Sequence, residues 1–153
     1  MQNKERTREI YKLAKDFKRK YPNTIVFRLK AHAKVISQFI GNDEKILYVF
    51  VAQKNYKSYE IVNTNIVVLT DKRLVLATKR LVFGYFFKMI TPDLFNDLSV
   101  HQGIIWGKVN IDTVKEEVIL SNIDKYALPE IENNIMKVML KDKKNDKEKK
   151  ESE

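Results

Sequence analysis

The amino-acid sequence predicts an α+β fold that is mainly β: a seven-stranded, partly open barrel capped by a C-terminal helix and preceded by two N-terminal helices. The first observation is a run of short segments from Glu44 in which apolar residues alternate with period two, as in strands. The second is one segment of helical period, from Leu128, which closes this run. Strands grouped together and followed by a helix favour the α+β class.

The chain divides into three segments. Residues 1–41 are expected to form a helical extension, residues 42–141 the barrel domain and residues 142–153 a charged tail. With 153 residues and 44% hydrophobic content, the chain can bury one core but not two. The tail contains no apolar residue to bury, so we expect it to be disordered, or to extend the preceding helix by a turn.

Two amphipathic helices are expected before the strands. The first covers about residues 5–20, and Pro22 ends it because the residue before a proline avoids the α region. The second is expected to be capped by Asn23 or Thr24 and to end at Gly41, which readily takes the left-handed conformation that follows many helices. Their apolar stripes are Ile10, Leu13, Ala14, Phe17 and Tyr21, and Ile25, Leu29, Ala33, Ile36 and Ile40.

Seven strands are expected after the helices. Asp71 and Lys72 form the turn of a hairpin between the second and third strands, and Lys79 and Arg80 form the next turn. Gly84 suggests a bulge in the fourth strand. The expected strands cover residues 44–52, 60–70, 73–78, 81–90, 94–101, 105–112 and 115–121.

Four motifs stand out among these strands. The most specific is the hairpin sequence Leu-Thr-Asp-Lys-Arg-Leu at residues 69–74, and supporting patterns lie at residues 44–47, 90–98 and 103–109. Together they resemble the bacterial PH-like domain family of the pleckstrin-homology superfold, over about residues 44–140. The resemblance implies seven strands closed by one helix, and a module that binds phosphoinositides, peptides or partner proteins rather than an enzyme.

One departure from the family pattern concerns phosphoinositides. Members that bind them carry basic residues at the end of the first strand and along the second. Here Lys54 and Lys57 match, but residues 60–65 contain neither lysine nor arginine. Tight phosphate recognition favours a fixed, often bidentate, array of basic groups, so the departure counts against a specific inositol-phosphate site.

The net charge of +9 lies mainly in the N-terminal arm. Residues 1–20 carry +5, residues 21–136 carry +2 and residues 137–153 carry +2. The body of the domain is nearly balanced, so the total charge does not indicate a nucleic-acid-binding face.

No constellation of catalytic, metal-binding or cofactor-binding residues is found in the sequence. The chain has no cysteine, and its two histidines, His32 and His101, lie in different elements without acidic neighbours at ligand spacing. Asp93 and Asp97 fit turns and helix caps better than acid–base work. We therefore expect no enzyme activity, no metal and no cofactor.

Two groups of residues are candidates for partner binding. Alternation places Trp106 and Lys108 on the exposed face of the sixth strand, with Ile105 and Gly107 turned inward; in the other register Trp106 is core. The second group comprises the aromatic residues Phe83, Tyr85 and Phe87 on one face of the fourth strand. For these aromatics, core packing beneath the N-terminal helices is favoured over contact with a partner.

The basic N-terminal helix has three interpretations, of which docking on its own domain comes first. Binding to an anionic membrane surface comes second and phosphate contacts to nucleic acid third. The membrane interpretation involves Lys4, Arg6, Arg8, Lys12, Lys15, Lys18, Arg19 and Lys20, helped by Lys54 and Lys57.

The leading hypothesis is a non-catalytic module that binds a protein or peptide, with a second copy of the chain as one candidate partner. A groove between the second-strand region and the closing helix is the first candidate site, ahead of Trp106 and the aromatic strand. The N-terminus has no apolar secretory segment, so a cytoplasmic location is expected, with peripheral membrane association as the alternative.

Overall fold

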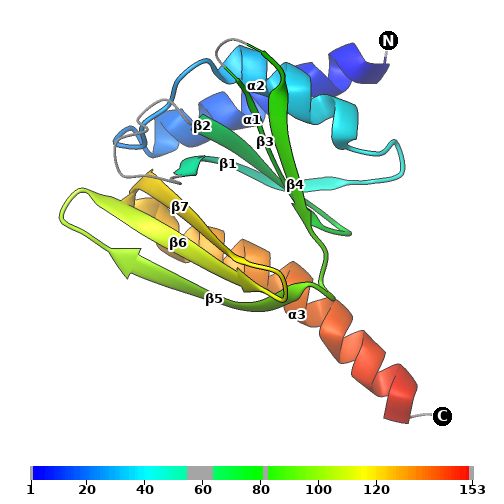
Figure 1. Ribbon diagram of the computed structural model, residues 1–153. Helices are drawn as coiled ribbons and strands as arrows, with labels where there is room; N and C mark the ends of the chain where they lie inside the picture. Colours follow the sequence, from blue (N-terminus) through cyan, green and yellow to red (C-terminus); the bar gives the residue numbers. More distant parts are fainter. Residues whose placement is uncertain (1, 55–63, 81–82, 152–153) are drawn as a thin grey trace.

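The computed structural model describes residues 2–54, 64–80 and 83–151 (Figure 1). As the sequence predicts, these ranges contain seven strands, followed by a C-terminal helix and preceded by N-terminal helices. The elements are α1 Gln2–Lys20, α2 Leu29–Ile36, η1 Ser37–Phe39, β1 Ile46–Lys54, β2 Thr64–Thr70, β3 Leu74–Lys79, β4 Tyr85–Ile90, β5 Phe95–Gln102, β6 Trp106–Thr113, β7 Glu117–Asp124, η2 Lys125–Ala127 and α3 Leu128–Glu151.

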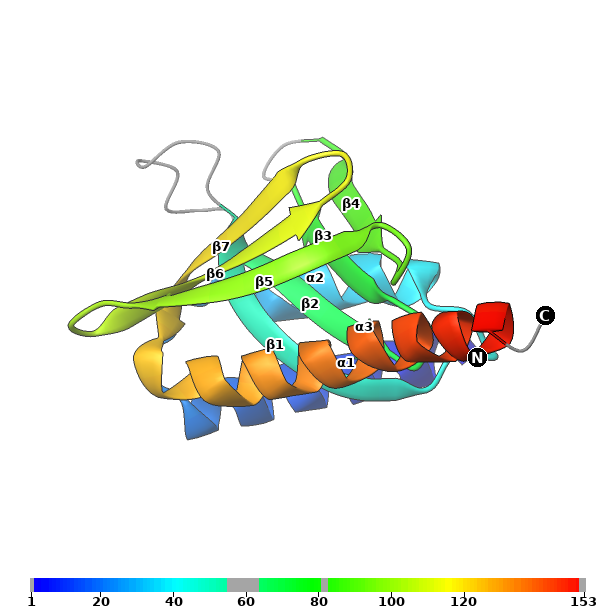
Figure 2. The same cartoon turned by 90° about the horizontal axis from the view of Figure 1, so that it is seen from below.

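The strands form one antiparallel sheet that curls into a half-barrel. Its order is β4-β3-β2-β1-β7-β6-β5. β1 pairs with β2 along most of its length but with β7 only at Gln53 and Lys54, so the sheet bends between β1 and β7 (Figures 1 and 2). Within the described ranges β4 and β5 are the two edges of the sheet. The predicted partly open barrel with a closing helix is confirmed.

The N-terminal helices pack against the β1–β4 half of the sheet and share its core. Ile10, Ala14 and Phe17 of α1 are buried, and the Phe17 ring lies 6.2 Å from the ring of Phe50 in β1. α2 packs against β2 and β3 (Figure 1). The docked interpretation of the basic helix is therefore confirmed: its apolar stripe is part of the core.

The closing helix covers the other half of the sheet. α3 packs against β5 and β6, and Ile131, Ile135 and Met139 on its inner stripe are fully buried. It also meets α1, because Lys20 Nζ donates a 2.7 Å hydrogen bond to Glu130 Oε1. The charges and buried residues of both helices thus fix the two halves of the sheet relative to each other.

The second helix begins later than the sequence predicts, at Leu29 rather than just after Thr24. The expected cap is used elsewhere, because Thr24 Oγ1 accepts a 3.0 Å hydrogen bond from the Asp124 amide in β7. The Ile25 amide donates to the Asn122 carbonyl at 3.0 Å, also in β7. These bonds between distant segments hold the chain out of the helix for several residues.

The fourth strand also begins later than predicted. Lys79 pairs with Tyr85, and the Arg80 amide donates to the Gly84 carbonyl at 3.0 Å, so the turn runs from Arg80 to Gly84. Gly84 has φ +75°, which suits glycine in a turn and replaces the predicted bulge. The expected start of this strand at residues 81 and 82 lies outside the described ranges.

α3 continues to Glu151, so helix covers most of the charged segment 142–153 that the sequence assigns to a tail. Lysine and glutamate have high helix propensity, and such residues can continue a helix that is already formed. Across the described ranges, no helix has the length and apolar composition that crossing a membrane requires.

Candidate functional site

β4 and the preceding Phe83 present large apolar side chains to solvent at an edge of the sheet. Phe83 is 82% exposed, Tyr85 51%, Phe86 43% and Met89 43%. The core packing that the sequence favours is therefore wrong for Phe83 and Tyr85, whereas Phe87 is partly buried against the core. The reason is the position of β4: among the described residues it has a strand neighbour on one side only. Exposed apolar side chains on a strand edge are a common feature of interaction surfaces.

One face of β4 forms a small aromatic cluster with Phe39 of η1. The Phe39 and Phe87 rings stack at 4.1 Å between centroids, and the Tyr85 ring lies 5.3 Å from Phe39. Phe87 is partly buried by this contact, whereas Tyr85 keeps about half of its surface exposed. The cluster is thus held on the core at one end and open to solvent at the other.

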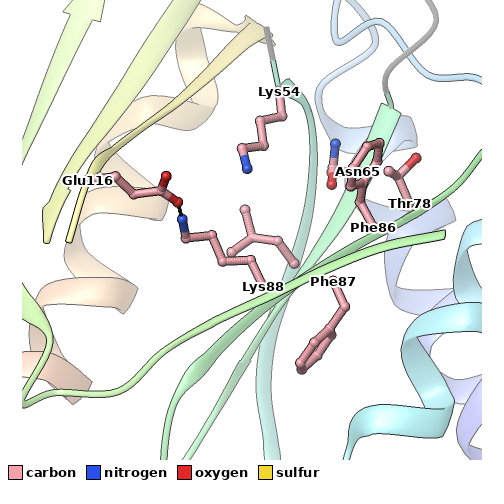
Figure 3. Close-up of a pocket in the computed structure, with 8 residues that line it drawn as sticks. Lys54, Asn65, Thr78, Phe86, Phe87, Lys88 and Glu116 are labelled. Atoms are coloured by element: carbon pink, nitrogen blue, oxygen red, sulfur yellow. Dashed lines mark ion pairs between the residues drawn. The ribbon is translucent and has the colours of Figure 1, made fainter. Parts of the chain in front are cut away.

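The opposite face of β4 borders a cleft of about 210 Å³ inside the half-barrel (Figure 3). Lys88 of β4 forms an ion pair with Glu116 from the β6–β7 turn, and Lys54 points toward the same place while Phe87 points away. The Arg80 guanidinium lies 3.9 Å from the centre of the Phe86 ring. The cleft is lined by Lys54, Asn65, Leu76, Thr78, Phe86, Phe87, Lys88 and Glu116.

Basic side chains lie close together at the cleft. Burial lowers the pKa of Lys88, and the positive charges of Lys54 and Lys115 lower it further. Burial is the larger cause, and the part contributed by neighbouring cations is what an anion beside Lys88 would offset. Among the described lining residues, Glu116 is the carboxylate, and it pairs with Lys88.

The hydrogen-bond register indicates which backbone groups of β4 face the open edge. The Arg80–Gly84 pair is bonded, so the next pair, Lys79 and Tyr85, is of the non-bonded type, and the two types alternate along the strands. By this alternation the N–H and C=O groups of Tyr85, Phe87 and Met89 point away from β3. Three residues of β4 can therefore bond to an added strand.

Trp106 and Lys108 lie where the alternation predicts. Trp106 is 42% exposed and Lys108 is exposed, whereas Gly107 between them is buried. The Trp106 Nε1–H donates a 2.7 Å hydrogen bond to the Asn23 carbonyl, a contact that the sequence did not suggest. Ile105, expected to point inward, is 45% exposed because it belongs to the β5–β6 turn rather than to β6.

The structure does not bring the two predicted partner-binding groups together. β3, β2, β1 and β7 separate β4 from β6 in the sheet order. The exposed side chains of β4 and Trp106 therefore belong to two separate surfaces.

The basic residues of α1 are divided between internal contacts and solvent. Arg6 donates to the Gly41 and Glu44 carbonyls, and Lys18 donates to two carbonyls of the following turn. Lys20 pairs with Glu130. Lys57 lies outside the described ranges. The remaining basic residues of the helix, Lys4, Arg8, Lys12, Lys15 and Arg19, are exposed.

The groove expected between the second strand and the closing helix is not found among the described residues. β2 lies between β1 and β3, and all seven of its described residues, Thr64–Thr70, are buried. α3 packs against β5 and β6 instead. Among the described residues, β2 is a central strand away from α3, and its Asn65 lines the cleft beside β4 instead.

Four residues of the site escaped the sequence analysis: Phe39, Arg80, Lys88 and Glu116. Phe39 lies more than forty positions from the strand that it contacts, and Glu116 comes from a turn in the other half of the sheet. No local pattern links such distant positions. As to metals, residues 2–54, 64–80 and 83–151 contain no group of three or more His, Cys, Asp or Glu side chains suited to an ion.

Comparison with known proteins gives one match. Residues 40–137 match the family model described as "Bacterial PH domain", which covers all seven described strands and the first part of α3 but not α1 or α2. Searches of curated proteins and of solved structures return no match. The matched region is the half-barrel with its closing helix, and it spans more than half of the chain. This chain belongs to the bacterial PH domain family.

Proposed function

We propose that this chain is a non-catalytic interaction module that binds an extended, acidic segment of a partner protein along the open edge of β4. The observation that carries the proposal is the edge of β4, which pairs with no strand in the described part of the chain and has exposed aromatic side chains. An extended segment that pairs with such an edge adds a strand to the sheet, so backbone hydrogen bonds supply affinity and alternate side chains supply specificity.

The two faces of β4 define the composition of the bound segment. Side chains of an added strand alternate between the faces of the sheet. On one face they would meet Tyr85 and Phe39, which favours apolar residues. On the other face they would lie beside Lys88 and Arg80 at the cleft, which favours aspartate or glutamate. The preferred segment therefore alternates acidic and apolar residues.

A partner protein is favoured over a second copy of the chain. Antiparallel pairing of two β4 edges would bring Lys79, Arg80 and Lys88 of both copies near one another, and like charges on neighbouring strands are destabilising. The net charge of +9 adds a repulsion between copies. We expect a monomer at low salt by multi-angle light scattering.

The test uses a fluorescein-labelled peptide that alternates glutamate with valine, measured by fluorescence anisotropy. Met89→Pro removes an edge-facing N–H without removing a bond to β3, and proline is tolerated at such positions. We expect Met89→Pro to weaken binding by about tenfold, because one backbone donor is lost and its partner carbonyl is left unpaired. Met89→Ala, which keeps the N–H, is the matched control and should bind much more tightly.

Two results would contradict the proposal. Equal affinities of the proline and alanine variants would exclude pairing at this edge. Equal affinity for a peptide in which lysine replaces every glutamate would exclude recognition of acidic residues. Far-ultraviolet circular dichroism of both variants checks that the sheet is intact.

A further inference from the structure

The turn between β5 and β6 is an apolar tip that projects from the body of the domain (Figure 2). Ile104 is 90% exposed, Ile105 45% and Trp106 42%. Tyr126, which is 70% exposed, lies at the base of the tip, because the preceding Lys125 amide donates to the Ile105 carbonyl at 3.2 Å. Single exposed apolar side chains are ordinary, but four on one projection form a contact surface.

The tip is held in a defined conformation. The Gly103 amide donates a 2.8 Å hydrogen bond to the Trp106 carbonyl, which closes the turn. The Trp106 indole N–H is bonded to the Asn23 carbonyl at 2.7 Å, so the ring is fixed with its polar atom inward. The exposed apolar surface is therefore presented by a preformed structure.

Basic side chains surround the base of this tip. Lys108 follows Trp106 on the exposed face of β6, and Lys125 lies over the Tyr126 ring at 5.2 Å. Lys18 Nζ bonds to the carbonyls on both sides of Asn23 at 2.6 Å, which places a third cation beside the indole. Within the described ranges none of these lysines has an ion-pair partner.

We propose that the β5–β6 tip inserts into the surface of a lipid bilayer that contains anionic phospholipids. An apolar projection fits a fluid surface, whereas a protein partner would need a matching cavity. Tryptophan and tyrosine lie preferentially at the boundary between headgroups and acyl chains, and lysines beside them bind anionic headgroups. The arrangement of Ile104, Trp106 and the three lysines follows that order from tip to base.

This surface is distinct from the cleft and from β4. The β5–β6 turn and the β6–β7 turn, which carries Glu116, lie at opposite ends of β6. It is also distinct from the exposed basic residues of α1, which carry no apolar surface of their own because the helix stripe is buried. The proposals of lipid binding at the tip and of peptide binding at β4 can therefore be tested separately, and one can be wrong while the other is right.

Co-sedimentation with vesicles tests the proposal. The vesicles contain phosphatidylcholine alone or phosphatidylcholine with phosphatidylglycerol. We expect the full chain to pellet with the anionic vesicles at low salt, and Trp106, the one tryptophan of the chain, to shift its emission to shorter wavelength. Ile104→Ser should weaken binding of the protein to the anionic vesicles by about tenfold, since the inserted surface loses most of one apolar side chain.

A matched control lies at the opposite end of β6. Val114 is 60% exposed in the β6–β7 turn, so Val114→Ser removes similar surface there and should leave partition unchanged. The proposal is overturned if the full chain does not pellet, or if Ile104→Ser pellets like the unmodified protein. It is also overturned if only an α1 variant, Arg8→Ala with Lys12→Ala and Lys15→Ala, loses binding.

Discussion

At the scale of single residues, His32 joins α2 to the end of β3. Its Nδ1 accepts a 2.8 Å hydrogen bond from the Lys79 amide, and the side chain is 1% exposed. Burial, followed by the positive charge of Arg28, lowers the pKa of His32 from 6.5 to about 4. The histidine is therefore neutral in the folded protein at neutral pH, and it accepts rather than donates at Nδ1.

This burial makes stability depend on pH. Because the pKa of His32 is lower in the folded state, its contribution is fully present above about pH 6.5 and is lost as the pH falls toward 4. We expect the free energy of unfolding to fall by roughly 2 kcal/mol more in the unmodified protein than in His32→Gln between about pH 7.5 and pH 5. Urea unfolding followed by circular dichroism measures both; equal losses would contradict the assignment.

The sequence could not place this histidine. The sequence showed only that His32 has no acidic neighbours at ligand spacing. Its burial follows from the packing of α2 against β3. For Trp106 the sequence did better, because alternation along one strand is a local property. Its bond to Asn23, however, joins positions far apart in the chain and has no local signal.

At the scale of elements, Glu44 connects η1, β1 and the β2–β3 hairpin. Its carboxylate accepts hydrogen bonds from Arg73 at 2.8 and 3.1 Å, from the Gly41 amide at 3.0 Å and from Thr70 at 2.8 Å. Burial acts to raise the pKa of Glu44, but these bonds outweigh it and hold the pKa below its ordinary value. Arg73 also donates to the Phe39 carbonyl at 2.6 Å, so the pair positions η1.

Removing this charge should loosen the contact between the hairpin and η1. We expect Glu44→Gln to reduce the free energy of unfolding by roughly 1–3 kcal/mol, because Arg73 loses its buried carboxylate and keeps its charge. Guanidinium unfolding at neutral pH measures the change. The control is Asp43→Asn, whose ion pair with Lys72 is solvent-exposed and should matter little. A larger effect for Asp43→Asn would contradict this assignment.

Elements with local signals were predicted well and those set by distant contacts were not. The hairpin at Asp71 and Lys72 is confirmed, because Leu69 pairs with Leu74 across it. The start of α2 was wrong, since hydrogen bonds to β7 replace the expected cap. Phe83 and Tyr85 were expected to be buried but are exposed. The sequence could not show this, because the edge position of β4 depends on the order of all seven strands.

At the scale of the whole molecule, the residues of the hydrophobic core extend beyond the range that matches the family model. The match begins at residue 40, whereas the core includes Ile10, Ala14 and Phe17 of α1. The N-terminal helices therefore complete the core of this chain although the family model does not include them. We infer that they are part of its folding unit and not an appended arm.

Substitutions in α1 test whether this helix is part of the folding unit. Ile10 is fully buried, so Ile10→Ala should reduce the free energy of unfolding by about 2–5 kcal/mol in a single cooperative transition. Lys12→Ala, on the exposed side of the same helix, should leave stability nearly unchanged. Thermal unfolding of both variants, followed by near-ultraviolet circular dichroism of Trp106, gives the answer. An unchanged transition in Ile10→Ala would show that α1 is not part of the folding unit.

The sequence by itself determined the fold class and the number of strands, because periodicity and turn residues are local and act within a few positions of each other. It also determined that the basic charge lies in the N-terminal segment, whereas the register of β6, and with it the outward side of Trp106, was left between two alternatives. Only the tertiary structure decided which strands are edges, which aromatics are exposed, and how Lys88, Arg80 and Glu116 meet at one cleft. These depend on contacts between distant segments, and such contacts leave no pattern that one segment can show.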